Sequence, residues 1–213
     1  MFRLLEAEEG CITIGGIDIS TLGLHALRTG MSVIPQMPTL FSGCTIRENL
    51  DPFAAFSDDS IYEALRDAHM LKTIQEQPSG LDAIVAEGGS NFSVGQRQLL
   101  CLARAILRKA KILVLDEATA NVDTRTDHLL QEAVARSFHG ATIIAVAHRL
   151  DTVIDYDKIL VLGNGEVLAF DTPEKLASEE GSVFSSMIDD TGRGMATELR
   201  RRASRSSLVD IKE

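Results

Sequence analysis

Two polar clusters in the middle of the chain carry residue types that bind anions and metal ions. Ser93 and Gly95 lie in a short polar turn that opens a stretch with apolar residues at helical spacing. A serine hydroxyl, a glycine and the N–H groups of a helix start form an anion-binding arrangement. Asp116 and Glu117 follow the branched apolar run 112–115, whose composition and length indicate a buried parallel strand. Because ligands of open parallel sheets gather at the carboxyl ends of strands, this order predicts a phosphate site with a metal ion.

Each cluster alone has a simpler explanation. A serine before a helix is most often only a cap, and two acids after a strand often face solvent. Gln36 follows the predicted strand 31–34 between two prolines, where a glutamine is either solvated or a contact for metal or water. His148 ends the predicted strand 142–147, where it is either structural or catalytic. The clusters occur together and in this order, which favours the phosphate interpretation.

The elements that must position these residues alternate between strands and helices. A hairpin is expected at 11–19 around two adjacent glycines, and a second one at 159–170. The region 44–110 is expected to be mostly helical, including a helix that begins after Ser57, and the N-terminal residues 1–9 read as the end of a helix. A further helix is expected over 125–138. This alternation predicts an α/β fold.

Composition narrows the class of protein. The chain has 213 residues, 45% of them apolar and 24% charged, which suits one soluble domain or one domain with a subdomain. A net charge of −10 argues against nucleic acid as a partner. Three cysteines without metal-like spacing favour a reducing compartment. No apolar run approaches the roughly 20 residues of a membrane span, and no signal-peptide pattern is present.

The residues after Gly192 differ in composition from the rest. They are rich in arginine and serine without apolar periodicity, so residues 193–213 are expected to form a disordered basic tail. Two arginines stand directly before Ala203 and Ser204, a pattern that basophilic kinases prefer. An unmodified, solvated tail and a tail that contacts anionic lipid head groups are the alternatives.

The motifs resemble those of ATP-binding cassette (ABC) proteins. Residues 92–96, Phe-Ser-Val-Gly-Gln, resemble the family's signature motif, and residues 113–117, Leu-Val-Leu-Asp-Glu, resemble its Walker B strand. Gln36 stands where the family has its Q-loop, residues 121–123 where it has its D-loop, and His148 where it has its H-loop. The order of the motifs is that of the family, and the resemblance covers about residues 1–192.

Three details resemble one subfamily. Val94 stands in place of the usual second glycine of the signature, and residues 49–53, Asn-Leu-Asp-Pro-Phe, follow the Q-loop. Both look like the second nucleotide-binding domain of subfamily C, the multidrug-resistance-associated exporters. Glu117 agrees, because the first domain of that subfamily commonly has aspartate there. A soluble ABC ATPase of translation or DNA repair is a less favoured alternative.

The resemblance implies roles for the residues at the strand ends. Asp116 would hold Mg²⁺, usually through water, and Gln36 would complete the metal and water shell. Glu117 would polarise the attacking water as a catalytic residue, and the second catalytic residue, His148, would hold the γ-phosphate.

The same resemblance implies a head-to-tail dimer with a second nucleotide-binding domain. Ser93, Val94, Gly95 and Gln96 would contact the γ-phosphate of an ATP molecule held by that domain. Asp123 would lie at the interface between the two domains. The transmembrane domains of an ABC exporter would be further partners, which places the chain on the cytosolic face of a membrane.

One part of the family pattern has no match. A phosphate-binding loop reads G-x-x-x-x-G-K-[ST], and no glycine in this chain is followed by lysine. The expected fold is therefore a P-loop-NTPase-like ABC core without its first strands and Walker A loop. The core would comprise residues 1–36 and 111–192, and a helical subdomain residues 37–110. A partial gene model, an alternative start and a remnant are the open explanations.

Two functions follow from the resemblance. The chain is either the C-terminal part of an ABC exporter's nucleotide-binding domain, inactive alone, or a non-catalytic module. Such a module would present its signature motif to another domain's ATP. In the first case ATP binding and hydrolysis drive transmembrane transport.

Overall fold

The structure is a computed structural model that describes residues 1–120, 122–147, 149–179 and 181–206. The chain forms two compact units, Met1–Val146 and Ala147–Glu213. The finer division predicted from the sequence, with a helical subdomain at 37–110, stays a prediction. The first unit contains the parallel sheet, and the second contains an antiparallel hairpin with helices.

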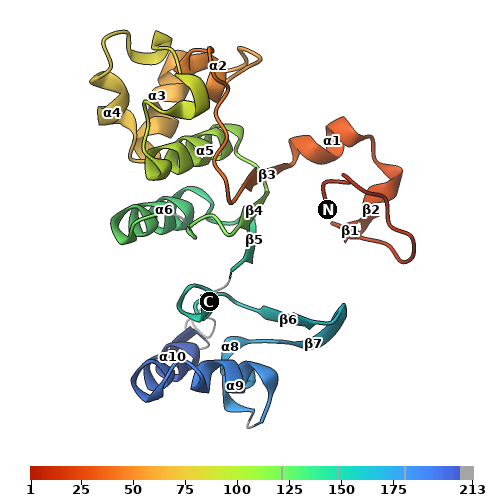
Figure 1. The fold of residues 1–213 in the computed structure, drawn as a ribbon. Helices are drawn as coiled ribbons and strands as arrows, with labels where there is room; N and C mark the ends of the chain where they lie inside the picture. The colour runs from red at the N-terminus through yellow and green to blue at the C-terminus, as the bar shows by residue number, and fades with distance from the viewer. Residues whose placement is uncertain (121, 148, 180, 207–213) are drawn as a thin grey trace. The chain divides into compact units, whose positions relative to one another are not determined.

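Three parallel strands organise the first unit (Figure 1). They are β3 (Met31–Ile34), β4 (Ile112–Asp116) and β5 (Thr142–Val146), in the order β3-β4-β5. The central strand β4 buries Leu113 and Leu115, as its run of apolar residues predicts. The α/β class predicted from the sequence is confirmed, and the parallel sheet is consistent with a P-loop-NTPase-like fold.

The N-terminal part of this unit holds the predicted hairpin. Strands β1 (Thr13–Ile14) and β2 (Ile17–Asp18) pair antiparallel around Gly15 and Gly16, whose φ angles are 57° and 80°. A 3₁₀ turn, η1 (Ile19–Thr21), and helix α1 (Leu24–Thr29) follow. The prediction of a helix end over residues 1–9 is wrong. The guanidinium of Arg3 instead donates to the backbone oxygens of Ile19 and Leu22, at 3.0 and 2.8 Å.

Helices pack against one face of the sheet and form the main core of this unit with it, while Val33 and Ile144 on the other face are exposed. Buried side chains of the helices pack together with those of β4, among them Leu65, Leu102 and Leu130. Ser57 accepts a hydrogen bond from the Ser60 amide and begins its helix, as predicted. The helical elements are α2 (Ile46–Leu50), α3 (Asp58–Asp67), α4 (Leu71–Gln75), η2 (Gly80–Asp82), η3 (Glu87–Gly89), α5 (Val94–Arg108) and α6 (Thr124–Ser137).

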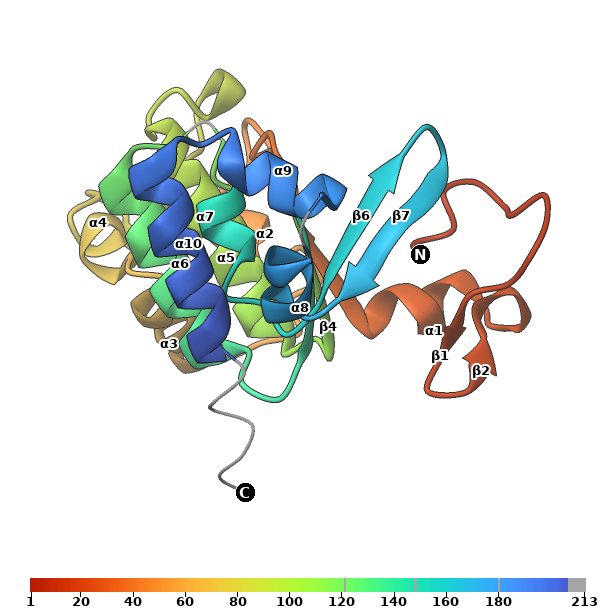
Figure 2. The same ribbon diagram turned by 90° about the horizontal axis from the view of Figure 1, so that it is seen from below.

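In its described residues, the second unit combines a hairpin with four helices. Strands β6 (Ile159–Gly163) and β7 (Glu166–Asp171) pair antiparallel, as the sequence predicts. The helices are α7 (Leu150–Val153), α8 (Pro173–Ser178), α9 (Val183–Asp189) and α10 (Arg193–Ser206), of which α8, α9 and α10 pack together (Figure 2). Their core includes Ile154, Leu176, Phe184 and Ile188.

The prediction of disorder after Gly192 is wrong for residues 193–206, which form α10. The helix buries Ala196, Leu199 and Ala203 at spacings of three and four residues. The stripe was not recognised from the sequence because two of its three residues are small alanines and arginines surround it. Residues 207–213 lie outside the described part of the chain.

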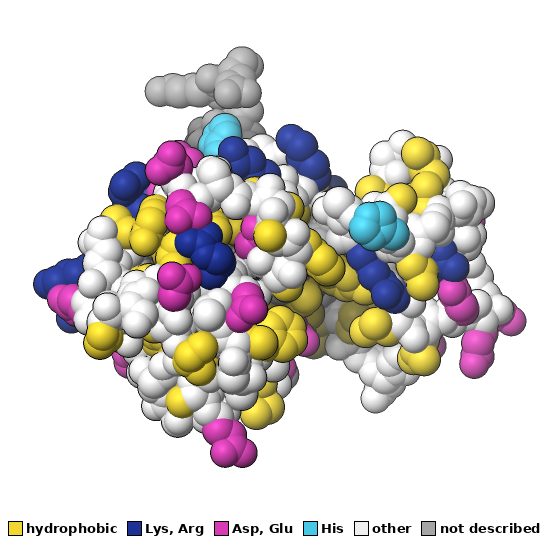
Figure 3. Space-filling view, turned by 90° about the horizontal axis from the view of Figure 1, so that it is seen from above, with side chains coloured by type: hydrophobic (Ala, Val, Ile, Leu, Met, Phe, Trp, Pro, Cys, Tyr) yellow, Lys and Arg dark blue, Asp and Glu magenta, His cyan; other side chains and the backbone are white. Residues whose placement is uncertain are grey.

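No helix in the described ranges is long and apolar enough to cross a bilayer. The longest, α5, has 15 residues and carries three arginines and two glutamines. Acidic, basic and apolar side chains are intermixed on the face drawn in Figure 3.

Candidate functional site

A glutamine and a glutamate meet at the carboxyl ends of two neighbouring strands. Gln36 follows β3 and Glu117 follows β4, and the two strands are paired in parallel. The Gln36 Nε2 donates a hydrogen bond to the Glu117 Oε2 at 2.5 Å. The two residues are 81 positions apart in the sequence, so their predicted proximity depends on the strand order that the structure now shows.

Glu117 has a backbone conformation that few non-glycine residues adopt. Its φ angle is 46°, in the left-handed region. Its N–H donates to the Val146 oxygen at 3.0 Å, which ties the residue to the end of β5. Such conformations cost roughly 1–3 kcal/mol and concentrate at functional sites. The fold therefore holds this carboxylate in one place at the expense of backbone strain.

The oxygen atoms at this edge suit Mg²⁺. Asp116, the exposed last residue of β4, adds a carboxylate beside Glu117, and the Gln36 amide adds a carbonyl oxygen. No group of three or more histidines, cysteines or carboxylates that could hold a metal ion is present among the described residues. Two carboxylates and one amide oxygen fit Mg²⁺, which commonly binds one or two protein carboxylates and completes its shell with water and phosphate.

Residues 93–96, here called the signature turn, are closed by reciprocal hydrogen bonds. The Ser93 Oγ accepts from the Gln96 amide at 3.1 Å, while the Ser93 amide donates to the Gln96 Oε1 at 2.9 Å. Ser93 and Val94 remain exposed, and Gly95 is buried. The turn thus presents the positive end of a 15-residue helix at the surface, as an anion site requires.

Gly95 is required by a close contact with the next helix. A Cβ atom at this position would lie 2.8 Å from both Cγ2 and Oγ1 of Thr126. Thr126 is itself fixed by Asp123, whose carboxylate accepts from the Thr126 amide at 3.1 Å and from its hydroxyl at 2.7 Å. These hydrogen bonds lower the pKa of Asp123. Two predicted site residues, Gly95 and Asp123, are therefore joined through one threonine that the sequence analysis did not single out.

Helix α5 also holds the loop that carries Gln36. The buried Gln98 donates to the Pro35 oxygen at 3.0 Å, and Arg104 donates to the Thr39 oxygen at 2.6 Å. These two anchors lie on either side of Gln36. The helix that begins at the signature turn thus positions the loop whose glutamine contacts Glu117.

Arg104 extends this network to α2. Its guanidinium donates to the Asn49 backbone oxygen at 2.5 Å and to the Asn49 Oδ1 at 2.8 Å, and lies 5.4 Å from the centre of the Phe41 ring. Sequence reasoning did not single out Gln98 or Arg104, and it used Asn49 only as part of the subfamily resemblance. One signal was available, because Gln98 occupies the apolar stripe of its helix, three and four residues before Cys101 and Leu102.

Two predicted positions lie outside the described residues. His148, the predicted γ-phosphate contact, is one, and Asn121 of the D-loop is the other. Their roles stay predictions.

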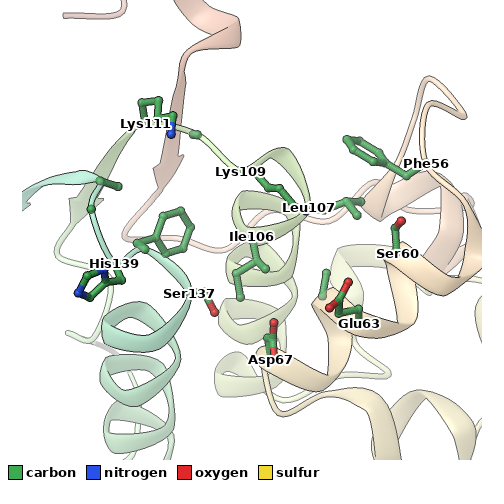
Figure 4. Close-up of a pocket in the computed structure, with 15 residues that line it drawn as sticks. Phe56, Ser60, Glu63, Asp67, Ile106, Leu107, Lys109, Lys111, Ser137 and His139 are labelled. Carbon is green, nitrogen blue, oxygen red and sulfur yellow. The ribbon is translucent and has the colours of Figure 1, made fainter.

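A cavity of about 500 Å³ lies elsewhere in the first unit (Figure 4). Its lining comes from α3, the end of α5 and the end of α6, and includes Lys111 and Ala141, which directly precede β4 and β5. Because Gln36, Asp116 and Glu117 lie at the opposite ends of the strands, this cavity is separate from the candidate site.

The parallel sheet with polar residues at neighbouring strand ends defines an α/β domain of the P-loop-NTPase-like class. Comparison with known proteins identifies the family. A family model described as "ABC transporter" matches residues 1–120. The chain belongs to the ABC transporter family, and this membership implies nucleotide binding, generally with Mg²⁺.

Curated proteins named as members of sub-family C are among the similar ones. The chain is 50% identical to mouse ATP-binding cassette sub-family C member 3 over 192 residues. The match covers 90% of this chain and 12% of the mouse protein. The chain is 50% identical over 190 residues, 89% of this chain and 12% of the relative, to multidrug resistance protein mrp-7 of Caenorhabditis elegans. Human sub-family C member 4 is 49% identical over 203 residues, 95% of this chain and 15% of that protein.

These comparisons confirm the predicted resemblance to a subfamily C nucleotide-binding domain. The chain spans between 12% and 15% of the length of these relatives. The activity, substrates and partners of a whole transporter are therefore a matter for proposal.

Proposed function

We propose that this chain is the signature-bearing, C-terminal part of the nucleotide-binding domain of an ABC exporter, where ATP binding and hydrolysis drive transmembrane transport. The observation that carries the proposal is the hydrogen bond between Gln36 and Glu117 at 2.5 Å, at the ends of neighbouring parallel strands. The capped signature turn at Ser93 supports it. Family membership supplies the reaction class, and these contacts supply the residues.

Each residue at the strand ends has its own role in the proposed hydrolysis of ATP. Glu117 is the general base that orients and polarises the water attacking the γ-phosphate. Gln36 holds the Glu117 carboxylate through its N–H and leaves its carbonyl oxygen for the metal shell. Asp116 would help to hold Mg²⁺, which when bound would neutralise charge on the phosphates. His148 would hold the γ-phosphate.

The signature turn serves a nucleotide held by a second nucleotide-binding domain, in a head-to-tail dimer. Exposed Ser93 and Val94, the Gly95 backbone and Gln96 offer hydrogen-bond donors and the positive end of α5 to the γ-phosphate. Asp123 lies at the dimer interface. The remaining partners are the transmembrane domains of the exporter, on the cytosolic face of the membrane.

The isolated chain is expected to be inactive. Its 213 residues contain no Gly-Lys pair, and the phosphate loop normally supplies the amides and the lysine that hold the β- and γ-phosphates. A non-catalytic role, in which the chain only presents its signature turn to another domain's ATP, is the second candidate. The exposure of Ser93 and Val94 favours it.

Two experiments test the proposal. A fluorescent ATP analogue with Mg²⁺ is titrated into the chain alone, where no micromolar binding and no turnover are expected. The chain is then mixed with an ABC nucleotide-binding domain that has an intact phosphate loop, and ATP-dependent association is followed by sedimentation.

The variant Ser93→Arg should abolish this association because it blocks the signature turn. Ser90→Arg is the matched control, since it adds the same charge at an exposed position three residues earlier. Micromolar ATP binding with turnover by the chain alone would contradict the proposed inactivity. Equal association of both variants would contradict the role of the signature turn.

A further inference from the structure

Helix α10 is fastened to the second unit by an apolar stripe. Ala196, Leu199 and Ala203 are buried in one cluster with Phe184 and Ile188 of α9. Leu199 is 1% exposed. The helix is thus part of the core of its unit, although its sequence is strongly basic.

Ion pairs fasten the same helix on its flanks. The Arg200 guanidinium donates to Asp189 at 2.8 Å and to the Ser185 Oγ at 3.1 Å. The Arg202 guanidinium pairs with Asp155 and donates to the Asp151 backbone oxygen at 2.8 Å. The arginines therefore hold α10 against the segments that precede it.

Ser204 lies in the last turn of this helix with its side chain at the surface. Its Oγ donates to the Arg200 oxygen at 3.0 Å. Arg201 and Arg202 stand three and two residues before it, the positions at which basophilic protein kinases bind arginine. In the folded unit, however, Arg202 is held by Asp155, and a kinase cleft takes its substrate as an extended segment.

We propose that Ser204 is a phosphorylation site for a basophilic serine/threonine kinase, and that the docking of α10 through Arg202 and Asp155 limits its modification. In the reaction the Ser204 Oγ attacks the γ-phosphorus of an ATP molecule held by the kinase. The Oγ–phosphorus bond forms, the bond from that phosphorus to the ADP oxygen breaks, and the hydroxyl proton passes to the kinase's catalytic aspartate.

The phosphate then changes how the helix docks. It adds about −1.5 to −2 charges at the negative end of the helix dipole, which opposes helix formation there. It also stands four residues after Arg200, so it competes with Asp189 for that guanidinium. Phosphorylation therefore loosens α10 from its unit, independently of the proposed catalytic site.

The test uses the full 213-residue chain with the catalytic subunit of cAMP-dependent protein kinase and Mg-ATP. Mass spectrometry locates the phosphate, which is expected on Ser204 and absent from Ser204→Ala. The variant Asp155→Asn removes the partner of Arg202 and leaves the kinase motif unchanged. Its initial rate of modification should rise about two- to fivefold, as expected for a partly exposed ion pair.

Asp157→Asn is the matched control. Asp157 is an exposed carboxylate two residues away, and among the described residues no ion pair joins it to α10, whereas Asp155 pairs with Arg202. Leu199→Ala undocks the apolar stripe and should raise the rate further. Hydrogen exchange of α10 should be faster in the phosphorylated chain than in kinase-treated Ser204→Ala.

The site assignment is overturned if no variant, including Leu199→Ala, takes phosphate on Ser204. The docking argument is overturned if Asp155→Asn and Asp157→Asn react at the same rate. It is also overturned if phosphorylation leaves the exchange of α10 unchanged.

Discussion

Replacing Gly95 with alanine tests whether the signature turn and the start of α6 are packed as one unit. The new Cβ atom would stand 2.8 Å from two atoms of Thr126, closer than van der Waals contact permits. Thr126 cannot turn away without losing its hydroxyl bond to Asp123, at 2.7 Å. Overpacking of this kind costs about 1–3 kcal/mol, and loss of a cap costs about 1 kcal/mol. Alanine in place of glycine in a helix raises the free energy of unfolding by about 0.5–1 kcal/mol, which offsets part of this cost.

The expected net effect of Gly95→Ala is a loss of about 1–3 kcal/mol in the free energy of unfolding. Gly194→Ala is the matched control. Gly194 is the second residue of α10, and a Cβ atom there meets nothing within 4 Å. That substitution should stabilise the chain by about 0.5–1 kcal/mol. Urea unfolding followed by far-UV circular dichroism suits a chain without tryptophan.

A second substitution isolates the contact. Thr126→Ala removes the two atoms that lie 2.8 Å from the new methyl group and leaves only the Cβ atom at 3.2 Å. The cost of Gly95→Ala should therefore shrink by at least about 0.5 kcal/mol in the Thr126→Ala background. If Gly95→Ala stabilises the chain as Gly194→Ala does, or costs the same in both backgrounds, the packing argument is refuted.

Three further predictions concern other contacts of the first unit. Gln98→Leu should speed hydrogen exchange in residues 37–41 and lower the free energy of unfolding by about 1–3 kcal/mol, because the Pro35 oxygen loses its part-buried donor. Unchanged exchange in these residues would contradict the role of Gln98 as an anchor. Exposed Cys11 should react with iodoacetamide well before Cys101, whose pKa is raised by burial, and reversal of this order by peptide mapping would contradict the burial. Because its hydrogen bonds lower the pKa of Asp123, ionised Asp123 stabilises the fold above its unfolded pKa of about 3.9, and this stabilisation is lost as the pH falls through the folded pKa. The difference in stability between the parent chain and Asp123→Asn should therefore shrink below about pH 4. A constant difference across urea melts at several pH values would refute this.

The strands and most helices were predictable because their signals are local. The mostly apolar strand β3 ends at a proline, and the branched apolar run of β4 ends at an aspartate. The site residues at the ends of β3 and β4 were predictable because parallel strands bring their carboxyl ends together.

Contacts between distant segments were not predictable in the same way. Gln98 and Pro35 are 63 positions apart, and no local pattern pairs a helix glutamine with one loop oxygen. The close approach of Gly95 to Thr126 likewise depends on how two helices pack. Helix α10 was missed because its apolar stripe is short and because its arginines find their partners, Asp155 and Asp189, outside its own sequence.

Glu117, held by Gln36, is the proposed general base of an ABC-type ATPase, and one substitution tests this role most directly. The chain is joined to an upstream segment that carries a complete phosphate-binding loop from an ABC domain, and ATP turnover and nucleotide binding are both measured. Glu117→Gln should lower turnover by about 10²–10⁴-fold while ATP binding persists, because only water activation is lost. A Glu117→Gln chimera that turns over ATP within about threefold of its parent, far less than the loss of a general base costs, would contradict the account.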